Sequence, residues 1–355
     1  MHSFDHLISA TKVAAAFPES IRGKTILITG VSPNSLGLAT AVAFASQHPS
    51  RLVLSGRSAE KVQSALDSVR SAYPLVKYDV LVMDLSSQAS VHAAAAQINE
   101  DVNIPTIDIL VNNAGVMAIP ALSFSEDNIE TTFATNHIGH FLFTNLIMSK
   151  IIKASEVSDT PTRIINVSSY GHQFSPVRFS DVNFSKLPSG LPEQERPDIE
   201  KALYLTGNDW SNAAYASISS YGQSKTANIL FSVSLNQKLG GKYGIASYAV
   251  HPGAVDTNIN RHADPQEIET ALARVKELGF DSPSRTPDQG ANSTLLAAVD
   301  PGLPPVDTSV LDVTGVYLSD CKLDNDACAT FARNRGLSER LWTLSEELVN
   351  QRFDF

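Results

Sequence analysis

The stretch TILITGVSPNSLGLA, residues 25–39, decides the fold of this chain. Its apolar first third is typical of a buried strand, and the small-residue pattern at 36–47 predicts a helix. Between them, Gly30 and Gly37 permit a tight turn and let backbone N–H groups approach an anionic ligand at the N-terminus of the helix. Taken alone, an ordinary strand–helix turn fits equally well, because the turn is one residue longer than usual for such a site and Ser35 stands at the place of the middle glycine.

The rest of the chain continues this alternation of short apolar strands and helices. Strands are predicted at 25–29, 51–55, 80–83, 107–111, 163–167 and 245–250, and helices at 36–47, 59–71, 87–98, 122–152 and 219–239. Such a pattern indicates a parallel sheet that is covered by helices on both faces. We therefore expect an α/β fold with a single doubly wound, Rossmann-type sheet, forming one domain over residues 1–355.

Four segments fall outside the alternation. They are an N-terminal helical extension at 1–21, a surface insertion at 170–214, a candidate substrate loop at 258–287 and a C-terminal helix at 337–351. Prolines at 176, 188, 192 and 197 among many polar residues indicate that the insertion is a long surface segment. We expect most of the substrate-pocket lining to come from the insertion and the candidate substrate loop.

Composition limits the classes of function. The chain has 355 residues, 43% hydrophobic and 18% charged, which is enough for a sizeable core. A net charge of -10 argues against broad binding of nucleic acid or anionic membranes. Cys321 and Cys328 are too few for a disulfide framework and lack a metal-ligand spacing. No apolar run reaches about 18 residues, so no transmembrane segment is predicted and a soluble cytoplasmic protein is expected.

A tyrosine and a lysine four residues apart open an apolar helical run in YGQSK, residues 221–225. This spacing places both side chains on one face of a helix. An ammonium group about 4 Å from a phenol lowers its pKa from about 10, so the pair is a candidate general acid and base. The alternative is a half-exposed aromatic ring beside a solvated lysine.

Candidate cofactor contacts follow the second and third strands. About 20 residues after Gly37, where an NAD site would carry an acidic residue, the chain has a glycine followed by Arg57, with Lys61 one helical turn later. A guanidinium group suits a 2′-phosphate, so NADP is favoured over NAD. Asp84 follows the third strand, where a carboxylate accepts the adenine amino group or caps the next helix equally well.

The fourth strand runs into Asn112-Asn113-Ala114-Gly115. Amide side chains at this place tie strand ends together, and Gly115 lets the backbone pass close to a bound ribose. A given four-residue string is rare by chance in a chain of this length, so the motif is specific.

These motifs occur in an order that resembles the short-chain dehydrogenase/reductase family over roughly residues 22–257. The motifs are Thr29-Gly30, NNAG at 112–115, NHIGHF at 136–141, NVSS at 166–169, the Tyr221/Lys225 pair and HPGAVDT at 251–257. Within that family, His172 after the serines, the long insertion and KTANILF at 225–231 look like the retinol-dehydrogenase and WW-domain-oxidoreductase branch.

The resemblance implies roles for particular residues. Tyr221 would donate and accept the proton, Lys225 would lower its pKa and hold the nicotinamide ribose, and Ser169 would hydrogen-bond the substrate carbonyl. Asn136 would anchor a water molecule in a proton relay. The cofactor contacts implied by the resemblance are Leu36, Arg57, Asp84, Asn113, Val255 and Thr257.

Strand alternation turns Ser168 and Ser169 to opposite sides, and motif alignment favours Ser169 over Ser168 as the residue facing the substrate. His137, His140 and His172 are expected to be packing or surface residues, and no metal site is predicted. The resulting hypothesis is an NADP(H)-dependent oxidoreductase that interconverts a carbonyl and an alcohol on a moderately apolar small molecule.

Two other functions stay open at this stage. One is a non-catalytic NADP-binding regulator on the same scaffold, which would not need the proton-transfer residues that the chain retains. The other is a sugar-nucleotide epimerase or dehydratase of the extended branch, whose usual Gly-x-x-Gly-x-x-Gly turn and larger C-terminal substrate domain are not found in the sequence. Because related folds commonly form dimers through flat helical faces, a homodimer is a candidate assembly.

Overall fold

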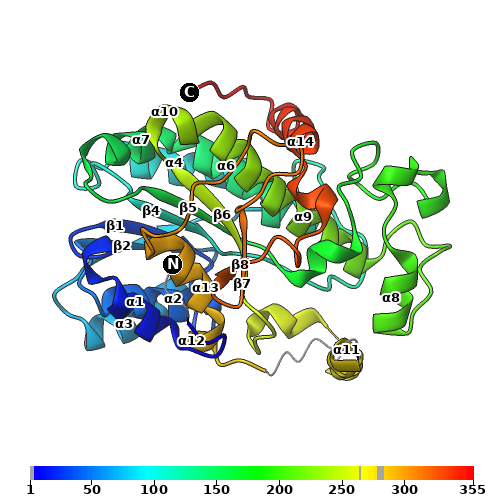
Figure 1. Cartoon of the computed structure of the whole chain (residues 1–355), viewed down its shortest axis with the longest axis horizontal. Helices are drawn as coiled ribbons and strands as arrows, with labels where there is room; N and C mark the ends of the chain where they lie inside the picture. Colours follow the sequence, from blue (N-terminus) through cyan, green and yellow to red (C-terminus); the bar gives the residue numbers. More distant parts are fainter. Residues whose placement is uncertain (1–3, 264, 278–283) are drawn as a thin grey trace.

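Eight strands form one sheet in the computed structural model, which describes residues 4–263, 265–277 and 284–355 (Figure 1). The strand order is β3-β2-β1-β4-β5-β6-β7-β8. All neighbouring strands pair in parallel except β8, which is antiparallel to β7. The strands are β1 Thr25–Thr29, β2 Arg51–Gly56, β3 Lys77–Val82, β4 Ile109–Asn112, β5 Arg163–Val167, β6 Ala246–His251, β7 Tyr317–Ser319 and β8 Lys322–Leu323.

Helices cover both faces of the sheet, which confirms the predicted Rossmann-type α/β fold (Figure 1). The helices are α1 Ala10–Ala16, α2 Leu36–Ala45, α3 Ala59–Ala72, α4 Gln88–Glu100, α5 Thr131–Phe133, α6 Gly139–Leu146, α7 Met148–Val157, α8 Ile199–Thr206, α9 Ser217–Leu235, α10 Gly241–Tyr243, α11 Pro265–Glu277, α12 Pro287–Gly290, α13 Asn292–Val299 and α14 Arg335–Leu348. Strand β1 shows why two layers form. Ile26 and Ile28 enter the core shared with α1, α2, α3 and α13, whereas Leu27 enters the core shared with α4, α6, α9 and α14.

Hydroxyl caps begin the first three helices that follow strands. Ser35, Ser58 and Ser87 each accept a hydrogen bond from the backbone N–H three residues later, at the start of α2, α3 and α4. Such caps satisfy N–H groups that have no partner within the helix. Ser35 is therefore the N-cap of α2 at the place where the sequence pattern led us to look for a glycine.

The predicted helix at 122–152 begins later and is not continuous. Residues 113–130 form a loop with one isolated bridge, and helical structure starts with α5. The buried Glu130 carboxylate sets this start, because it accepts the backbone N–H groups of Thr132 (2.9 Å) and Phe133 (2.8 Å). A π-helical turn at Ala134–Ile138 then separates α5 from α6, and a break at Ile147 separates α6 from α7.

The N-terminal extension contains one short helix, α1, that packs on α2 and α13. Thr11 of α1 also donates its backbone N–H to the Asp288 carboxylate. Residues 1–3 of the predicted extension lie outside the described residues. The C-terminal helix α14 packs along α9. Within the described residues, no helix combines the length and the apolar character that a membrane crossing requires; the cytoplasmic location and the homodimer stay predictions.

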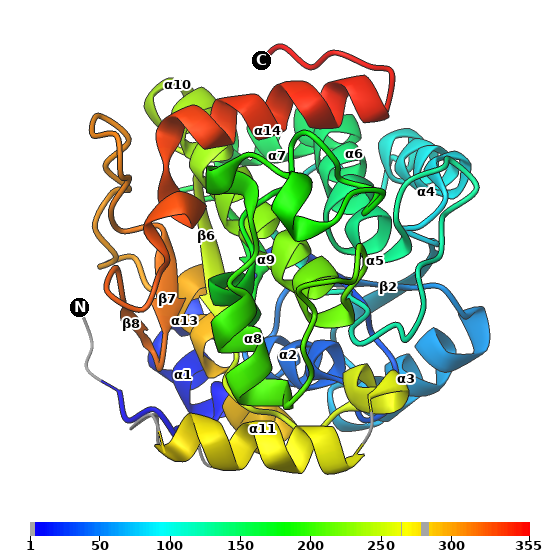
Figure 2. The ribbon, with the colours of Figure 1, turned by 90° about the vertical axis from the view of Figure 1, so that its right-hand side faces the viewer.

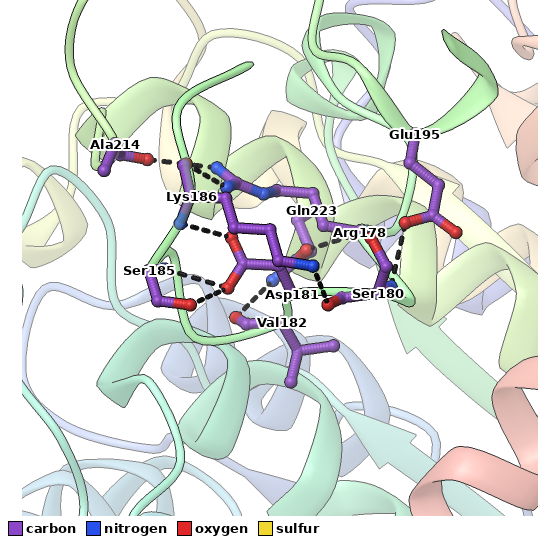
Figure 3. Close-up of polar contacts among 9 residues, drawn as sticks. All are labelled: Arg178, Ser180, Asp181, Val182, Ser185, Lys186, Glu195, Ala214 and Gln223. Atoms are coloured by element: carbon purple, nitrogen blue, oxygen red, sulfur yellow. Dashed lines mark hydrogen bonds and ion pairs between the residues drawn. The ribbon is translucent and has the colours of Figure 1, made fainter. Parts of the chain in front are cut away.

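The predicted surface insertion at 170–214 is partly a buried structure. It contains 3₁₀ turns at Tyr170–Phe174, Pro188–Gly190 and Glu193–Glu195 besides the unpredicted α8. Arg178, Phe184 and Glu195 are each no more than 2% exposed. Figure 3 shows the polar contacts among residues 178–186 of the insertion, which also bind Glu195, Ala214 and Gln223 of α9.

Helix α11 lies within the candidate substrate loop and packs against α8 of the insertion (Figure 2). Tyr204 of α8 donates its hydroxyl to the Glu277 carboxylate (3.1 Å). Position 264 and positions 278–283 of this loop lie outside the described residues.

Candidate active site

A cavity of about 1230 Å³ runs along the edge of the sheet where strands β2, β1, β4 and β5 end. Carboxyl ends of parallel strands are where ligands of such sheets bind. Twelve of the residues singled out in the sequence line this cavity: Gly30, Leu36, Arg57, Lys61, Asp84, Asn113, Gly115, Ser169, Tyr221, Lys225, Val255 and Thr257. The fold thus brings together residues from the turn after β1 to the loop after β6.

Gly37 and Asn136 lie behind the lining. A Cβ atom at Gly37 would meet the Gly30 carbonyl oxygen at 2.7 Å and Asn113 Nδ2 at 2.8 Å. A Cβ at Gly30, whose φ is +75°, would meet the Ala114 Cα at 2.6 Å. Both glycines therefore let the turn after β1 touch the turn after β4, which is a packing requirement that the sequence pattern did not reveal.

A buried chain of hydrogen bonds holds that contact. His140 Nδ1 contacts the Asn136 carbonyl oxygen (3.0 Å), so this nitrogen carries the proton, because a carbonyl only accepts. Burial lowers the pKa of His140 to about 4, which keeps the ring neutral and leaves Nε2 to accept the Thr29 hydroxyl (2.9 Å). Thr29 Oγ1 in turn accepts the N–H groups of Asn113 (2.9 Å) and Ala114 (3.0 Å).

Asp84 lies two residues beyond the end of β3 and supports the turn into α4. Its Oδ1 accepts the backbone N–H of Ser86 (2.9 Å) and the Ser86 hydroxyl (2.6 Å). The N-cap of α4 is Ser87, so the alternative of Asp84 as the cap itself is wrong. Asp84 nevertheless lines the cavity.

The two serines after β5 face different partners. Ser168 Oγ donates to the Lys225 carbonyl oxygen on α9 (2.8 Å), which commits its only proton to the backbone. Ser169 Oγ accepts the Gly171 N–H (3.1 Å) and hydrogen-bonds the Tyr221 side chain. Although 52 positions separate Ser169 from Tyr221, the insertion between them leaves the two side chains in contact.

Burial controls the protonation of the tyrosine and lysine on α9. It raises the pKa of Tyr221 to about 12, and the hydrogen bond with Ser169 only partly offsets this rise. It lowers the pKa of Lys225 to about 7. Loss of hydration dominates the pKa of Tyr221, and the predicted lowering of this pKa by Lys225 is not found.

Lys225 points along the inner wall of the cavity. Its Nζ donates to the Val167 carbonyl oxygen at the end of β5 (2.9 Å) and lies 5.5 Å from the centre of the Tyr221 ring. A Cβ atom at Gly115 would come within 3.5 Å of the Nζ atom and 3.2 Å of Asn136 Oδ1. The glycine therefore leaves the space in front of the ammonium group open.

Asn136 is fully buried in the π-helical turn, and its side chain joins two other segments. Oδ1 accepts the Val116 N–H (2.8 Å), while Nδ2 donates to the Val116 carbonyl oxygen (3.0 Å) and to Ser224 Oγ (2.9 Å). Both amide protons are thus occupied by protein partners. The geometry ties the cavity segment at Val116 to α9.

The apolar lining comes from an unexpected place. No residue of the insertion at 170–214 belongs to the described cavity lining. This corrects the prediction that the insertion would supply much of the pocket wall. The loop after β4 contributes Val116, Met117, Ile119 and Pro120 instead. The candidate substrate loop does contribute to the lining, with residues 258–263 and Ser284, and the turn before it contributes residues 252–257. The reason is that side chains of the insertion, such as Arg178, pack into its own network behind α9.

The histidines outside the cavity bind protein groups. His137 Nε2 contacts Ser345 Oγ (2.8 Å), and His172 Nε2 accepts the Ala329 N–H (3.1 Å). His251 Nδ1 accepts the Tyr170 N–H (3.2 Å) in the turn after β6. Among the described residues, no group of three or more His, Cys, Asp or Glu side chains is placed to hold a metal ion.

Comparison with known proteins places the chain in a family. The family model described as short chain dehydrogenase matches residues 24–180. The oxidoreductase fscI of Fusarium equiseti is 38% identical over 250 residues, which cover 70% of this chain and 94% of that protein. Human retinol dehydrogenase 12 is 32% identical over 332 residues, covering 94% of this chain and 88% of that protein.

A solved structure agrees over nearly the whole length. An uncharacterized protein of Mycobacterium paratuberculosis has a TM-score of 0.62 and 26% identity, with 96% of this chain and 98% of that chain covered. The chain therefore belongs to the short-chain dehydrogenase/reductase family, in its retinol dehydrogenase-like branch. It is an oxidoreductase of a family that works with a nicotinamide cofactor.

Proposed function

We propose that this protein is an NADP(H)-dependent oxidoreductase that interconverts a carbonyl and an alcohol on a moderately apolar small molecule. The observation that carries the proposal is the contact between Ser169 and Tyr221 at one end of a cavity whose other end is lined by Arg57 and Lys61. One end of the cavity has the groups for proton transfer and the other has the groups for an anionic cofactor.

The lining fits a dinucleotide. The cavity exceeds the size of about 300–1000 Å³ that is usual for small-ligand pockets. It passes from Arg57 along the N-terminus of α2, where a pyrophosphate is favoured by free N–H groups and by the helix dipole. It then reaches Gly115 and Lys225, where the missing Cβ leaves room beside the ammonium group for a ribose.

The proton-transfer groups are arranged for carbonyl chemistry. A bound nicotinamide supplies or accepts the hydride at the substrate carbon. Ser169 donates its hydroxyl proton to the substrate oxygen as a hydrogen bond, and Tyr221 transfers its own proton to that oxygen during reduction. Because burial holds the pKa of Tyr221 at about 12, its proton is present at neutral pH. The same groups act in the opposite order during oxidation.

Lys225 stabilises the phenolate that Tyr221 becomes after it has given up its proton. The ammonium group lies on the same helical face as the tyrosine and is fixed by the Val167 carbonyl oxygen. In the dry interior, this positive charge acts strongly on a phenolate that exists only after proton transfer. We propose that Lys225 also holds the nicotinamide ribose.

Asn136 positions the cavity wall in this proposal. Its side chain fixes Val116 against the buried Ser224, which directly precedes Lys225 on α9. A proton relay through a water molecule at Asn136 stays a prediction. The backbone carbonyl oxygen of Asn136, which His140 Nδ1 contacts, is one acceptor for such a water molecule.

The substrate class follows from the apolar part of the cavity lining. Met117, Ile119 and Pro120 present apolar surface to the cavity that Ser169 and Tyr221 also line. An apolar wall with few convergent polar groups is typical of a site for an apolar small molecule. Similarity to retinol dehydrogenases supports apolar alcohols and aldehydes as the first candidates.

The test measures NADPH consumption with a panel of apolar aldehydes, ketones and quinones, in parallel with NADH. We expect turnover that prefers NADPH and that falls about 10²- to 10⁴-fold in Tyr221→Phe, because the general acid is lost. Tyr73→Phe is the matched control, since Tyr73 also precedes a lysine by four residues but lies at the end of α3, outside the described cavity lining.

Full activity in Tyr221→Phe would contradict the assigned proton donor. Tight NADPH binding without turnover of any panel member would favour the non-catalytic regulator. Equal use of NADH and NADPH would contradict the proposed cofactor preference.

A further inference from the structure

Two arginines about 200 positions apart in sequence line the same end of the cavity. Arg57 follows β2, and Arg261 lies in the 3₁₀ turn Asn258–His262 that follows β6. Both side chains are exposed and belong to the lining, together with Lys61. The sequence motifs explain Arg57 and Lys61, whereas nothing in the sequence connects Arg261 with them.

Hydrogen bonds fix the turn that carries Arg261 against the glycine-rich turn after β1. Asn258 Nδ2 donates to the Pro33 carbonyl oxygen (2.8 Å), which joins the two turns directly. Arg261 Nη1 donates to the Asn258 carbonyl oxygen (2.9 Å), and its Nε contacts His262 Nε2 (3.1 Å). The guanidinium group is thereby held at the rim of the cavity and keeps donors available.

The two guanidinium groups repel each other. The pKa of Arg261 is lowered, first by partial loss of hydration and second by the positive charge of Arg57. The described lining contains four Lys or Arg residues (Arg57, Lys61, Lys225 and Arg261) and two acidic residues (Asp84 and Asp256). The whole chain has the opposite balance, with 27 Lys and Arg residues against 37 Asp and Glu residues. Positive charge is therefore concentrated in the cavity against the net charge of the protein, which favours an anion there.

We propose that Arg261 is a second guanidinium ligand of the adenosine 2′-phosphate, facing Arg57 across the rim of the cavity. This inference rests on the proposed use of NADP(H) and goes beyond it by assigning a specificity-determining residue on the loop after β6. An arginine grips phosphate oxygens with two parallel hydrogen bonds, and one dianionic phosphate relieves the repulsion between both arginines.

Calorimetric titration with adenosine 2′,5′-bisphosphate and adenosine 5′-monophosphate tests this assignment without any turnover. We expect Arg261→Gln to weaken binding of the bisphosphate at least about tenfold and to leave binding of the monophosphate within about twofold. NADPH and NADH should show the same contrast. The dependence of bisphosphate affinity on salt concentration should also become shallower, because one charge at the phosphate is lost.

Arg22→Gln is the matched control, because it removes the same charge from an exposed arginine that pairs with Glu19 outside the described lining. It should leave the affinities for both nucleotides within about twofold. In the double variant of Arg57→Gln and Arg261→Gln, the two losses of binding free energy for the bisphosphate should not add, since both residues bind the same phosphate. Unchanged far-ultraviolet circular dichroism shows that each variant is folded.

Equal weakening of bisphosphate and monophosphate in Arg261→Gln would overturn the assignment, because the residue would then serve the 5′-phosphate. Unchanged binding of both would also overturn it. Failure of the proposed catalytic function has a different signature: the bisphosphate effect would persist while no carbonyl substrate is turned over.

Discussion

At the scale of single residues, Gly171 controls the position of the tyrosine ring. A Cβ atom at this place would meet both Cδ1 and Cε1 of Tyr221 at 2.9 Å, which is closer than real Cβ contacts allow. We predict that Gly171→Ala displaces the ring and lowers kcat at least about tenfold, because small misplacements of a catalytic group are costly. Steady-state kinetics should show the loss in kcat with little change in KM for NADPH.

Gly190→Ala provides the matched control for this prediction. Gly190 lies in the same insertion, and a Cβ atom there meets nothing within 4 Å. The Gly190→Ala variant should leave kcat and thermal stability unchanged. Wild-type kcat in Gly171→Ala would show that the ring does not need the position seen here.

Protonation of Lys225 should set the pH dependence of carbonyl reduction. Because burial lowers its pKa to about 7, the ammonium form dominates below that pH and decreases tenfold per unit above it. Tyr221, with a pKa of about 12, stays protonated over the same range. We therefore predict that kcat/KM with saturating NADPH is constant below pH about 6 and falls above pH about 7.

The Lys225→Arg variant tests whether deprotonation of Lys225 causes this decrease in kcat/KM. The guanidinium group stays charged throughout the range, so the decrease near pH about 7 should disappear even if the overall rate is lower. Neither His140, with a pKa of about 4, nor His251, with a pKa of about 3, titrates in that window. A decrease that persists unchanged in Lys225→Arg would assign the titration to another group.

At the scale of elements, helix α9 carries functional side chains on two opposite faces. Tyr221 and Lys225 face the cavity, while Gln223 between them faces the insertion (Figure 3). Its Oε1 accepts the Arg178 N–H (2.9 Å), and its Nε2 donates to the Val182 carbonyl oxygen (3.1 Å). The insertion is also joined to α14, because Glu195 pairs with Arg340 (3.1 Å). The insertion is therefore a brace behind the candidate catalytic helix.

We predict that Gln223→Met lowers the free energy of unfolding by about 2–4 kcal/mol, because two buried backbone groups lose their partners. Urea denaturation with a fluorescence readout measures this loss. Limited proteolysis should also cut first within the insertion, since its attachment to α9 is weakened.

Gln63→Met is the comparison variant, because Gln63 is exposed on α3 and its side chain donates to the neighbouring Asp67. Its effect should stay within about 0.5 kcal/mol. If both variants were equally stable, the hydrogen bonds of Gln223 would not contribute to holding the insertion.

At the scale of the whole molecule, the order of the strands assembles the site. Strands β1, β4 and β5 lie side by side in the sheet although the chain between them includes several helices. Their carboxyl ends deliver the glycine-rich turn, the NNAG turn and the serine pair to one edge. The loop after β6 then closes this edge through the contact between Asn258 and Pro33.

The sequence by itself predicted the fold class and most of the strands. Apolar runs such as Thr25–Thr29 bury completely, and their alternation with helices has one common solution, a parallel sheet with two covered faces. Residues at strand ends, such as Arg57 and Asp84, could be placed in one cavity for the same reason. These conclusions depend on local pattern and on a topological rule, so no knowledge of long-range contacts was needed.

Only the tertiary structure decided the properties that depend on burial and on contacts between distant segments. The pKa values of Tyr221 and Lys225 follow from the loss of hydration inside the folded protein, which reversed the expected shift of the tyrosine. The start of α5 depends on the buried Glu130 carboxylate. Likewise, Arg261 meets Arg57 only because the loops after β6 and β2 reach the same rim, and linear spacing contains no signal for that meeting.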